Sequence, residues 1–323
     1  ENLLYEVNTD LQETEKKLLR LKYDKYPIII VMGALRSGTT LTMQWLANTG
    51  QFSYPTNFIS RFYQAPIVGA KIQKLLLDPA YNFRNEIVDF SRDVNYCSEN
   101  GKTKGAMAPN EFWYFWRRFL HYDLLPADYI SDDELKNIFD VKTFVQEILG
   151  VANVFGKPFA IKGMIANYNI GFLDSILDNV IFLYIKREPS SNIKSVLEAR
   201  NRQSGNEKMW YSFRIPEMNR LQCIEDPEEQ IAGQLFYINK AIQDGLKNVS
   251  EERKMEMRYE DFCQNPEKYY NILRGKIRGQ GYEISSEYHG EKQFKITRNE
   301  DLSQIQDKYN KFLGGINDGR KRQ

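Results

Sequence analysis

Residues 33–40 read GALRSGTT and lie between the apolar run PIIIVM and the segment LTMQWLANTG. The run is short, continuous and rich in β-branched residues, which is typical of a strand buried on both faces of a parallel sheet. After it we expect a helix over residues 37–48, with Gly50 as the residue that stops it. The first N–H groups of a helix have no intrahelical partner, and the helix dipole favours negative charge there. A strand, a glycine-bearing turn and a helix start therefore predict an anion site.

The glycines of this stretch have the spacing of a phosphate-binding P-loop, which is written G-x-x-x-x-G-K-[ST]. Gly33 and Gly38 fit the two glycines and Thr40 fits the last position, but Thr39 stands in place of the lysine. The cation of this loop is Arg36 instead. In nucleoside triphosphatases the lysine reaches the β- and γ-phosphates, so its absence argues against ATP or GTP hydrolysis. A nucleotide with a single phosphate at its 5′ end does not need that lysine.

Three further segments have the pattern of strands, and each lies beside a segment with the pattern of a helix. The strands are expected at residues 159–164, 180–186 and 255–259, and the helices at residues 141–151, 172–177, 192–200 and 228–247. Strands that alternate with helices predict an α/β fold with a P-loop-like, mainly parallel central sheet flanked by helices. The aromatic-rich region 51–129 is expected to form a helical insertion over the sheet edge.

We expect one domain over residues 1–323, with a helix within residues 1–25, a core over residues 27–280 and an extension over residues 281–323. The segment 9–26 carries a stripe of leucines at helical spacing. Thr9 and Gln12 have the spacing of a capping box, which predicts that the first helix begins near Thr9.

The composition is ordinary for a soluble globular protein, and its charges nearly balance. Lys and Arg number 44 and Asp and Glu 43, so no bulk field favours nucleic acid or an anionic membrane as a partner. The longest apolar runs fall far short of the roughly 20 residues that span a bilayer, and no secretion signal opens the sequence. A cytoplasmic location is therefore expected, although a first residue of glutamate leaves room for a removed leader. Three scattered cysteines and two histidines predict free thiols and no metal site.

The stretch PIIIVMGALRSGTTL resembles the 5′-phosphosulfate loop of sulfotransferases that use 3′-phosphoadenosine 5′-phosphosulfate (PAPS). Members of this family carry P-K-S-G-T-T or P-R-S-G-T-T after the first strand, and here Leu35 replaces the proline. The broad group of bacterial and tyrosylprotein enzymes is the most similar. The resemblance implies that Arg36 lies near the transferring sulfuryl group. It also implies that the 5′-phosphate is held by residues of the loop, namely Ser37, Gly38, Thr39 and Thr40.

Two later segments fit the same family. VIFLYIKREPSSNIKSVLEAR resembles its second motif, with Arg187 at the end of a strand and Ser195 eight residues later. The resemblance implies that these two residues bind the 3′-phosphate that distinguishes PAPS, and arginine offers a forked, charge-assisted contact for it. MEMRYEDFCQNP resembles the family's strand-end Y-E-D, which implies that Tyr259 lies near the adenine.

The general base is harder to assign. Cytosolic members carry a K-T-H triplet, and here Lys162 matches its lysine while Met164 replaces its histidine. Lys162 is then a cation for the leaving group, unless it is a strand-end lysine in solvent. Two candidate bases remain. Glu111 opens an aromatic stretch that is expected to desolvate it and raise its pKa, and His121 has a suitable ordinary pKa. The alternative interpretation of Glu111 is an acidic residue at the start of a helix, where the helix dipole favours it. The alternative interpretation of His121 is an ordinary surface or core histidine.

The resemblance implies sulfuryl transfer to a hydroxyl-bearing acceptor, by in-line displacement with a general base, cations at the leaving phosphate and no metal. Asn57 and Arg61 follow the loop helix and are candidates to bind that acceptor, with a carbohydrate or small molecule favoured. The string Trp210–Ser212 is a candidate edge of the cleft. A non-catalytic nucleotide-binding or interaction protein and a P-loop kinase or NTPase are the rival functions. The sequence determines neither the acceptor nor the oligomeric state.

Overall fold

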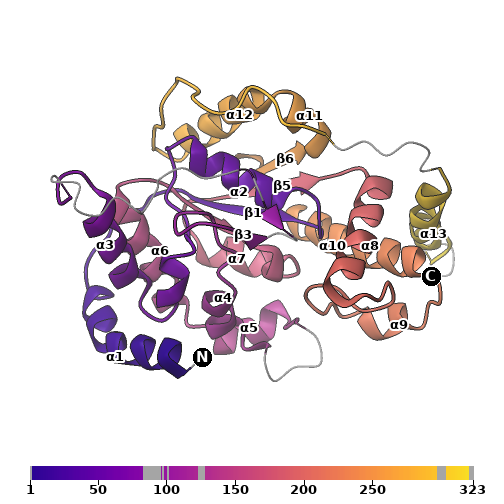
Figure 1. Ribbon diagram of the computed structural model, residues 1–323, viewed down its shortest axis with the longest axis horizontal. Coiled ribbons are helices and arrows are strands. Elements are labelled where there is room, and N and C mark those ends of the chain that lie inside the picture. Colours follow the sequence, from indigo (N-terminus) through magenta and orange to yellow (C-terminus); the bar gives the residue numbers. More distant parts are fainter. Residues whose placement is uncertain are drawn as a thin grey trace.

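The computed structural model describes residues 2–82, 96, 98–99, 102–122, 128–296 and 303–319. Its centre is a four-stranded parallel sheet with the strand order β4-β1-β5-β6, which confirms the predicted fold class (Figure 1). The predicted strands are present to within two residues at each end. They are β1 (Ile28–Gly33), β4 (Phe159–Lys162), β5 (Val180–Lys186) and β6 (Lys254–Arg258).

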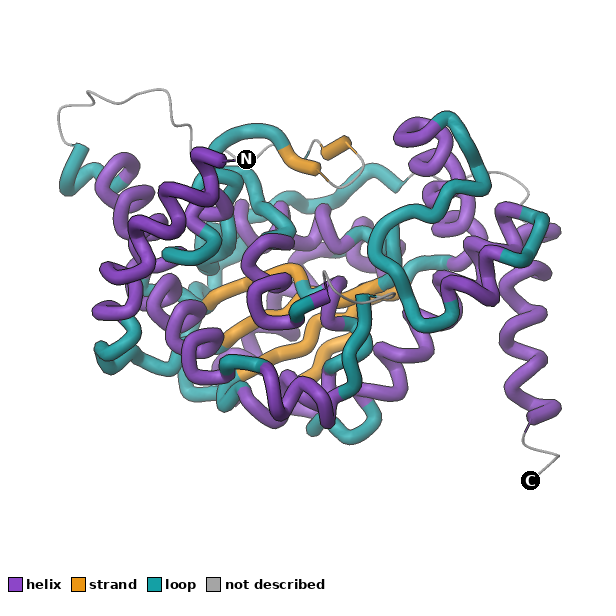
Figure 2. The backbone as a smooth tube through the Cα atoms, turned by 90° about the horizontal axis from the view of Figure 1, so that it is seen from below, coloured by secondary structure: helices purple, strands orange, loops and turns teal. Residues whose placement is uncertain are grey.

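Helices cover both faces of the sheet, and Figure 2 shows the strands enclosed between them. One face carries α2 (Thr39–Asn48), α11 (Tyr259–Gln264) and α12 (Pro266–Gly279). The other carries α4 (Trp113–Leu120), α6 (Val141–Phe155), α7 (Ile170–Ile176), α8 (Pro189–Ser204) and α10 (Pro227–Leu246). The four helices predicted around the later strands are present, and α6 and α8 extend several residues beyond their predicted ends.

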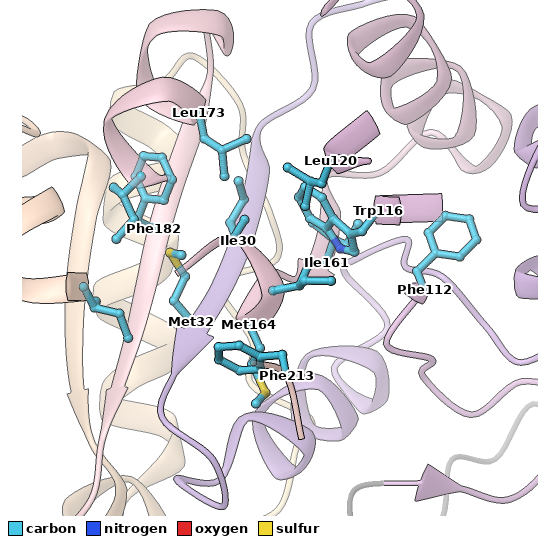
Figure 3. Packing of buried hydrophobic residues seen from close by; sticks show 14 of the residues in the cluster. Ile30, Met32, Phe112, Trp116, Leu120, Ile161, Met164, Leu173, Phe182 and Phe213 are labelled. Carbon is cyan, nitrogen blue, oxygen red and sulfur yellow. The ribbon is translucent and has the colours of Figure 1, made fainter. Parts of the chain in front are cut away.

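The apolar run before the loop supplies both layers of the core. Side chains alternate across a strand, so Ile29 and Val31 pack under α2, while Ile30 and Met32 pack against the opposite helices. All four side chains are fully buried. Figure 3 shows Ile30 in the second layer together with the α4 residue Trp116. This double burial is the physical reason that the run is uniformly apolar rather than alternating.

The first helix differs from its prediction. Helix α1 (Asn2–Leu18) begins seven residues before Thr9, whose hydroxyl donates to the carbonyl of Tyr5 inside the helix, so the capping box does not form. Its position is fixed by tertiary contacts instead. The buried carboxylate of Glu15 accepts the backbone N–H groups of Ile67 and Val68, at 2.8 and 3.0 Å, at the start of α3 (Pro66–Leu77).

The aromatic-rich region contains the predicted helical insertion, where it is described. It includes η1 (Ile59–Phe62), α3 and α4, and Ser53 forms a parallel bridge to Phe159 at the β4 edge of the sheet. A small hairpin, β2 (Ser98–Glu99) with β3 (Lys102–Thr103), was not predicted. Residues 83–95, 97, 100–101 and 123–127 of this region, and with them Cys97, lie outside the described residues.

The remaining elements lie around this core. They are α5 (Asp132–Ile138), η3 (Met164–Ala166), α9 (Met218–Gln222), η4 (Glu251–Arg253) and α13 (Ser303–Gly319). Helix α13, yellow in Figure 1, packs against α10 and α8. Cys223 is an exposed free thiol and Cys263 a buried one. No helix in the described part of the chain is both long and apolar enough to cross a membrane.

The connections between strands leave a crevice at one edge of the sheet. Strands β1 and β5 are neighbours, but the chain leaves β1 toward α2 on one face and leaves β5 toward α8 on the other. In open parallel sheets, the crevice at the carboxyl ends of two such strands is where ligands bind. The loop of residues 33–38 and the residue Arg187 lie at these two strand ends.

Candidate active site

The loop after β1 has the backbone of a phosphate-binding turn. Arg36 and Gly38 both adopt left-handed conformations, with φ of 58° and 104°. Helix α2 begins at Thr39, and its N-cap is Gly38. Ser37 is therefore not the N-cap, although a serine often has that role in an ordinary strand-to-helix turn. The hydroxyl of Ser37 is instead buried and has no hydrogen-bond partner among the described residues. A buried donor without a partner at a helix N-terminus is suited to an anionic ligand.

Gly38 is required by its surroundings as well as by its backbone. A Cβ built at this position would lie 2.4 Å from the ring of Tyr259, a distance that real Cβ contacts do not show. The loop therefore packs directly against the tyrosine that follows β6. This contact places the third sequence motif against the first.

We expect Gly38→Ala to lower the free energy of unfolding by about 2–4 kcal/mol, because alanine adds backbone strain at positive φ and an overlap with Tyr259. Urea denaturation measures this change. Gly281→Ala is the matched control, since Gly281 also has a positive φ, of 80°, but nothing within 4 Å of a built Cβ. Equal losses in the two variants would show that the ring contact contributes nothing.

Arg187 ties the second motif to the loop. Its Nη1 donates to the carbonyl of Arg36 at 2.8 Å, and its guanidinium lies over the Tyr259 ring, 4.7 Å from the centroid. Its Nε is buried without a partner in the described structure. The side chain of Arg36 completes the link, because its Nε donates to Ser195 on α8 at 3.2 Å. The residues assigned to the 5′ and 3′ ends of the nucleotide thus form one connected network.

Lys162 belongs to the same site and is not a solvent lysine. Its side chain is 5% exposed, and its Nζ donates to the hydroxyl of Thr40 at 3.0 Å. It also forms an ion pair with Glu111. Met164, which stands in the position of the histidine of the K-T-H triplet, accepts a hydrogen bond from Thr39 at 3.4 Å through its sulfur. The end of β4 therefore holds the start of α2 through two side-chain contacts.

The electrostatics of Glu111 differ from the prediction. Burial raises the pKa of Glu111, but the Lys162 ammonium and a hydrogen bond from the Trp113 indole together hold it below its ordinary value. The expected rise in pKa is therefore wrong for this structure, because a cation reaches the carboxylate. Glu111 also precedes α4 and is not part of its first turn, since Phe112, with φ of 57°, is the N-cap.

These residues line a common cavity of about 190 Å³. It includes most of the predicted cofactor residues and two of the string at 210–212: Arg36, Gly38, Thr39, Thr40, Glu111, Lys162, Arg187, Tyr211, Ser212 and Tyr259. Tyr211 forms a hydrogen bond with Arg36. Three cations and one carboxylate line the wall, so the cavity suits a polyanion. His121 is not among its lining residues; it is exposed at the C-cap of α4.

A second cavity, of about 690 Å³, lies beside the first and shares Glu111 with it. Both predicted acceptor residues, Asn57 and Arg61, line this second cavity. The amide of Asn57 is engaged within the protein: it donates to the carbonyl of Gly105 at 2.9 Å and accepts from Asn110 at 2.8 Å. Asn57 therefore shapes the wall, while Arg61 is exposed.

Asn167 is a residue of the site that the sequence analysis missed. It is fully buried, and its amide donates to the carbonyl of Gly33 at 2.9 Å, which fixes the entry to the loop. A buried asparagine at the end of a short 3-10 helix has no distinctive sequence pattern, so only the structure reveals this contact. The described residues contain no group of three or more His, Cys, Asp or Glu side chains placed to hold a metal ion.

Comparison with known proteins identifies the family and the fold. The sequence model of the sulfotransferase family matches residues 27–273. No curated protein matches the sequence. The sulfotransferase STF9 from Mycobacterium avium is similar in structure, with a TM-score of 0.55 at 14% identity, over 95% of this chain and 81% of that one. STF1 from Mycobacterium tuberculosis H37Rv gives a TM-score of 0.55 at 12% identity, over 94% and 80%. At these identities the likeness concerns the fold.

Proposed function

Because the chain belongs to the sulfotransferase family, we propose that it transfers a sulfuryl group from PAPS to a hydroxyl of an acceptor molecule. One observation carries the choice of PAPS. A P-loop without its lysine faces the strand-end Arg187, whose Nε is buried without a partner among the described residues. The loop suits a single 5′-phosphate, and the arginine suits a second phosphate elsewhere on the same nucleotide.

The residues of the first cavity fit the parts of this nucleotide. The N–H groups at the start of α2, with the hydroxyls of Ser37 and Thr40, suit the 5′-phosphosulfate. Arg187 and Ser195, joined through Arg36, suit the 3′-phosphate. Tyr259, whose ring lies under the Arg187 guanidinium, offers an aromatic surface that suits the adenine. PAPS supplies an activated sulfuryl group, so no metal is needed for the transfer.

The protein's own groups provide the acid–base chemistry. Glu111 is the carboxylate that both cavities share, and its lowered pKa keeps it ionised at neutral pH. We assign it as the general base that accepts the proton of the acceptor hydroxyl. That oxygen then bonds to sulfur as the bond from sulfur to the phosphate oxygen breaks. Lys162, which contacts both the loop and Glu111, stabilises the charge that grows on the leaving phosphate.

Lys162→Met is expected to raise the pKa of Glu111, because burial then acts on the carboxylate without the opposing cation. A base works only when ionised, so activity rises with pH through its pKa. In the wild type this rise lies at acidic pH, and in the variant it moves toward neutral pH. A pH–rate profile measures the shift. Lys186→Met, at an exposed lysine at the end of β5, is the control. An unmoved profile in Lys162→Met would argue against Glu111 as the base.

Calorimetry of the wild type tests the proposal directly. We expect 3′-phosphoadenosine 5′-phosphate (PAP) to bind more tightly than 5′-AMP, and ATP with Mg²⁺ not to compete. Sulfur-labelled PAPS, offered with a panel of sugars, phenols and alcohols, then tests transfer. Preferential binding of ATP with Mg²⁺ would point to a kinase or NTPase instead. Tight binding of PAP without transfer to any acceptor would point to a non-catalytic nucleotide-binding protein.

A further inference from the structure

The residues that line the second cavity indicate chemical features of the acceptor beyond its hydroxyl group. Resting on the function proposed above, we infer that the acceptor is an organic anion: a molecule with a ring-sized apolar body, a hydroxyl and a separate anionic group. The hydroxyl lies toward Glu111, the body lies on the aromatic wall and the anionic group lies at the rim beside Arg61 and Lys102.

The cavity wall next to Glu111 is apolar. Phe112 is buried there, Trp113 is half-buried, and Pro109 completes the surface. The volume of about 690 Å³ lies within the range of about 300–1,000 Å³ that is usual for small-molecule sites. Flat aromatic surface beside a single carboxylate suits a ring whose hydroxyl points at that carboxylate.

The charged residues that line the cavity are mostly positive. Arg61 and Lys102 both line it, and both are exposed to solvent. The only carboxylate among the described lining residues is Glu111, which is already paired with Lys162. Within the described structure, neither Arg61 nor Lys102 forms an ion pair with a carboxylate of its own. Among the described side chains that line the cavity, the rim therefore carries more positive than negative charge.

Both cations stand on backbone that the protein fixes in place. The fully buried Asn8 donates to the carbonyl of Arg61 at 2.7 Å and accepts from the N–H of Gln64 at 2.8 Å. Asn57 donates to the carbonyl and the hydroxyl of Thr103, which follows Lys102, at 3.2 and 3.3 Å. Buried or half-buried amides thus fix the backbone on each side of the rim.

A matched pair of glycosides tests the inference. 4-Nitrophenyl β-D-glucuronide and 4-nitrophenyl β-D-glucoside share a ring, an aromatic group and hydroxyls, and differ by a carboxylate in place of a hydroxymethyl group. Calorimetry with the PAP-saturated enzyme measures each affinity at low and high salt. For the wild type at low salt we expect the glucuronide to bind about 10-fold more tightly, from two exposed charge contacts, and the preference to shrink with added salt.

The double variant Arg61→Gln/Lys102→Gln is expected to bring the two affinities within about twofold of each other, since the charge contacts are then gone. Arg20→Gln/Lys22→Gln, which removes one arginine and one lysine from an exposed stretch outside the cavity, is expected to keep the preference. PAP affinity, measured on each variant, shows that the fold is intact.

Three results would overturn the inference: equal wild-type affinities, no binding of either glycoside, or a preference that persists in Arg61→Gln/Lys102→Gln. The two proposals fail separately. If PAP binds with the expected preference over AMP but the glycosides are not distinguished, the proposed function stands and the anionic acceptor is rejected. If PAP does not bind the wild type, the proposed function is rejected and the inference falls with it.

Discussion

Replacing Glu111 with glutamine is expected to lower kcat by about 10²–10⁴-fold, because the variant lacks the carboxylate that we propose as the acceptor of the hydroxyl proton. Glutamine keeps the size of the side chain and can still accept the hydrogen bond from Trp113. It removes the partner of Lys162, however, so that cation is left free to contact the nucleotide phosphates. We therefore expect the affinity for PAP to be unchanged or tighter while turnover collapses. Single-turnover transfer from labelled PAPS and calorimetry with PAP measure the two effects separately.

Two further variants make this result specific. Glu198→Gln removes a carboxylate that is half-exposed on α8 and lies outside both cavities, and it is expected to leave kcat unchanged. His121→Asn tests the other candidate base. The exposed position of His121 at the end of α4 predicts that its removal costs less than threefold, on the order of a surface substitution. A large loss in His121→Asn with little loss in Glu111→Gln would reverse the assignment of the base.

The strands and the loop were predictable from the sequence because their causes are local. A strand buried on both faces must be apolar at every position, and the run at residues 27–33 meets that condition. The glycine spacing of the loop is likewise a local requirement, and Gly38 meets it with its positive φ. The start of α1 was not predictable in this way. Glu15 holds that helix through a contact with a helix about fifty residues later, and this contact outweighs the capping pattern at Thr9.

The electrostatics of the site depended on long-range contacts that a sequence pattern does not contain. The aromatic neighbours of Glu111 predicted a raised pKa, and burial does act in that direction. The opposing cation, Lys162, comes from a strand that is 51 residues further along the chain. The same holds for Arg36, whose bond to Ser195 crosses 159 residues. The motifs were enough to list the residue types at the site. The direction of a pKa shift, however, depends on which charged side chains are in contact in the folded protein.

Replacing Arg187 with alanine is expected to lower the affinity for PAP by about 30-fold or more, which corresponds to the 2–5 kcal/mol that loss of one partner of a desolvated charge pair costs. The forked guanidinium, with its buried Nε, is the group that we propose to bind the 3′-phosphate. The loss has a second component. Arg187 also holds the carbonyl of Arg36, so we expect the variant to loosen the loop that is proposed to bind the 5′-phosphate.

AMP separates these two components, because it carries the 5′-phosphate and lacks the 3′-phosphate. Loosening of the loop weakens both ligands, whereas loss of the 3′ contact weakens PAP alone, so the ratio of the two affinities isolates the direct effect. We expect this ratio to approach one in Arg187→Ala and to recover only partly in Arg187→Lys, which restores the charge without the fork. Arg202→Ala, at a half-exposed arginine on the same helix as Ser195, controls for the loss of one positive charge. If the preference for PAP survives in Arg187→Ala, or disappears equally in Arg202→Ala, then Arg187 does not read the 3′-phosphate. The assignment of the second motif would then be wrong even though the fold remains that of a sulfotransferase.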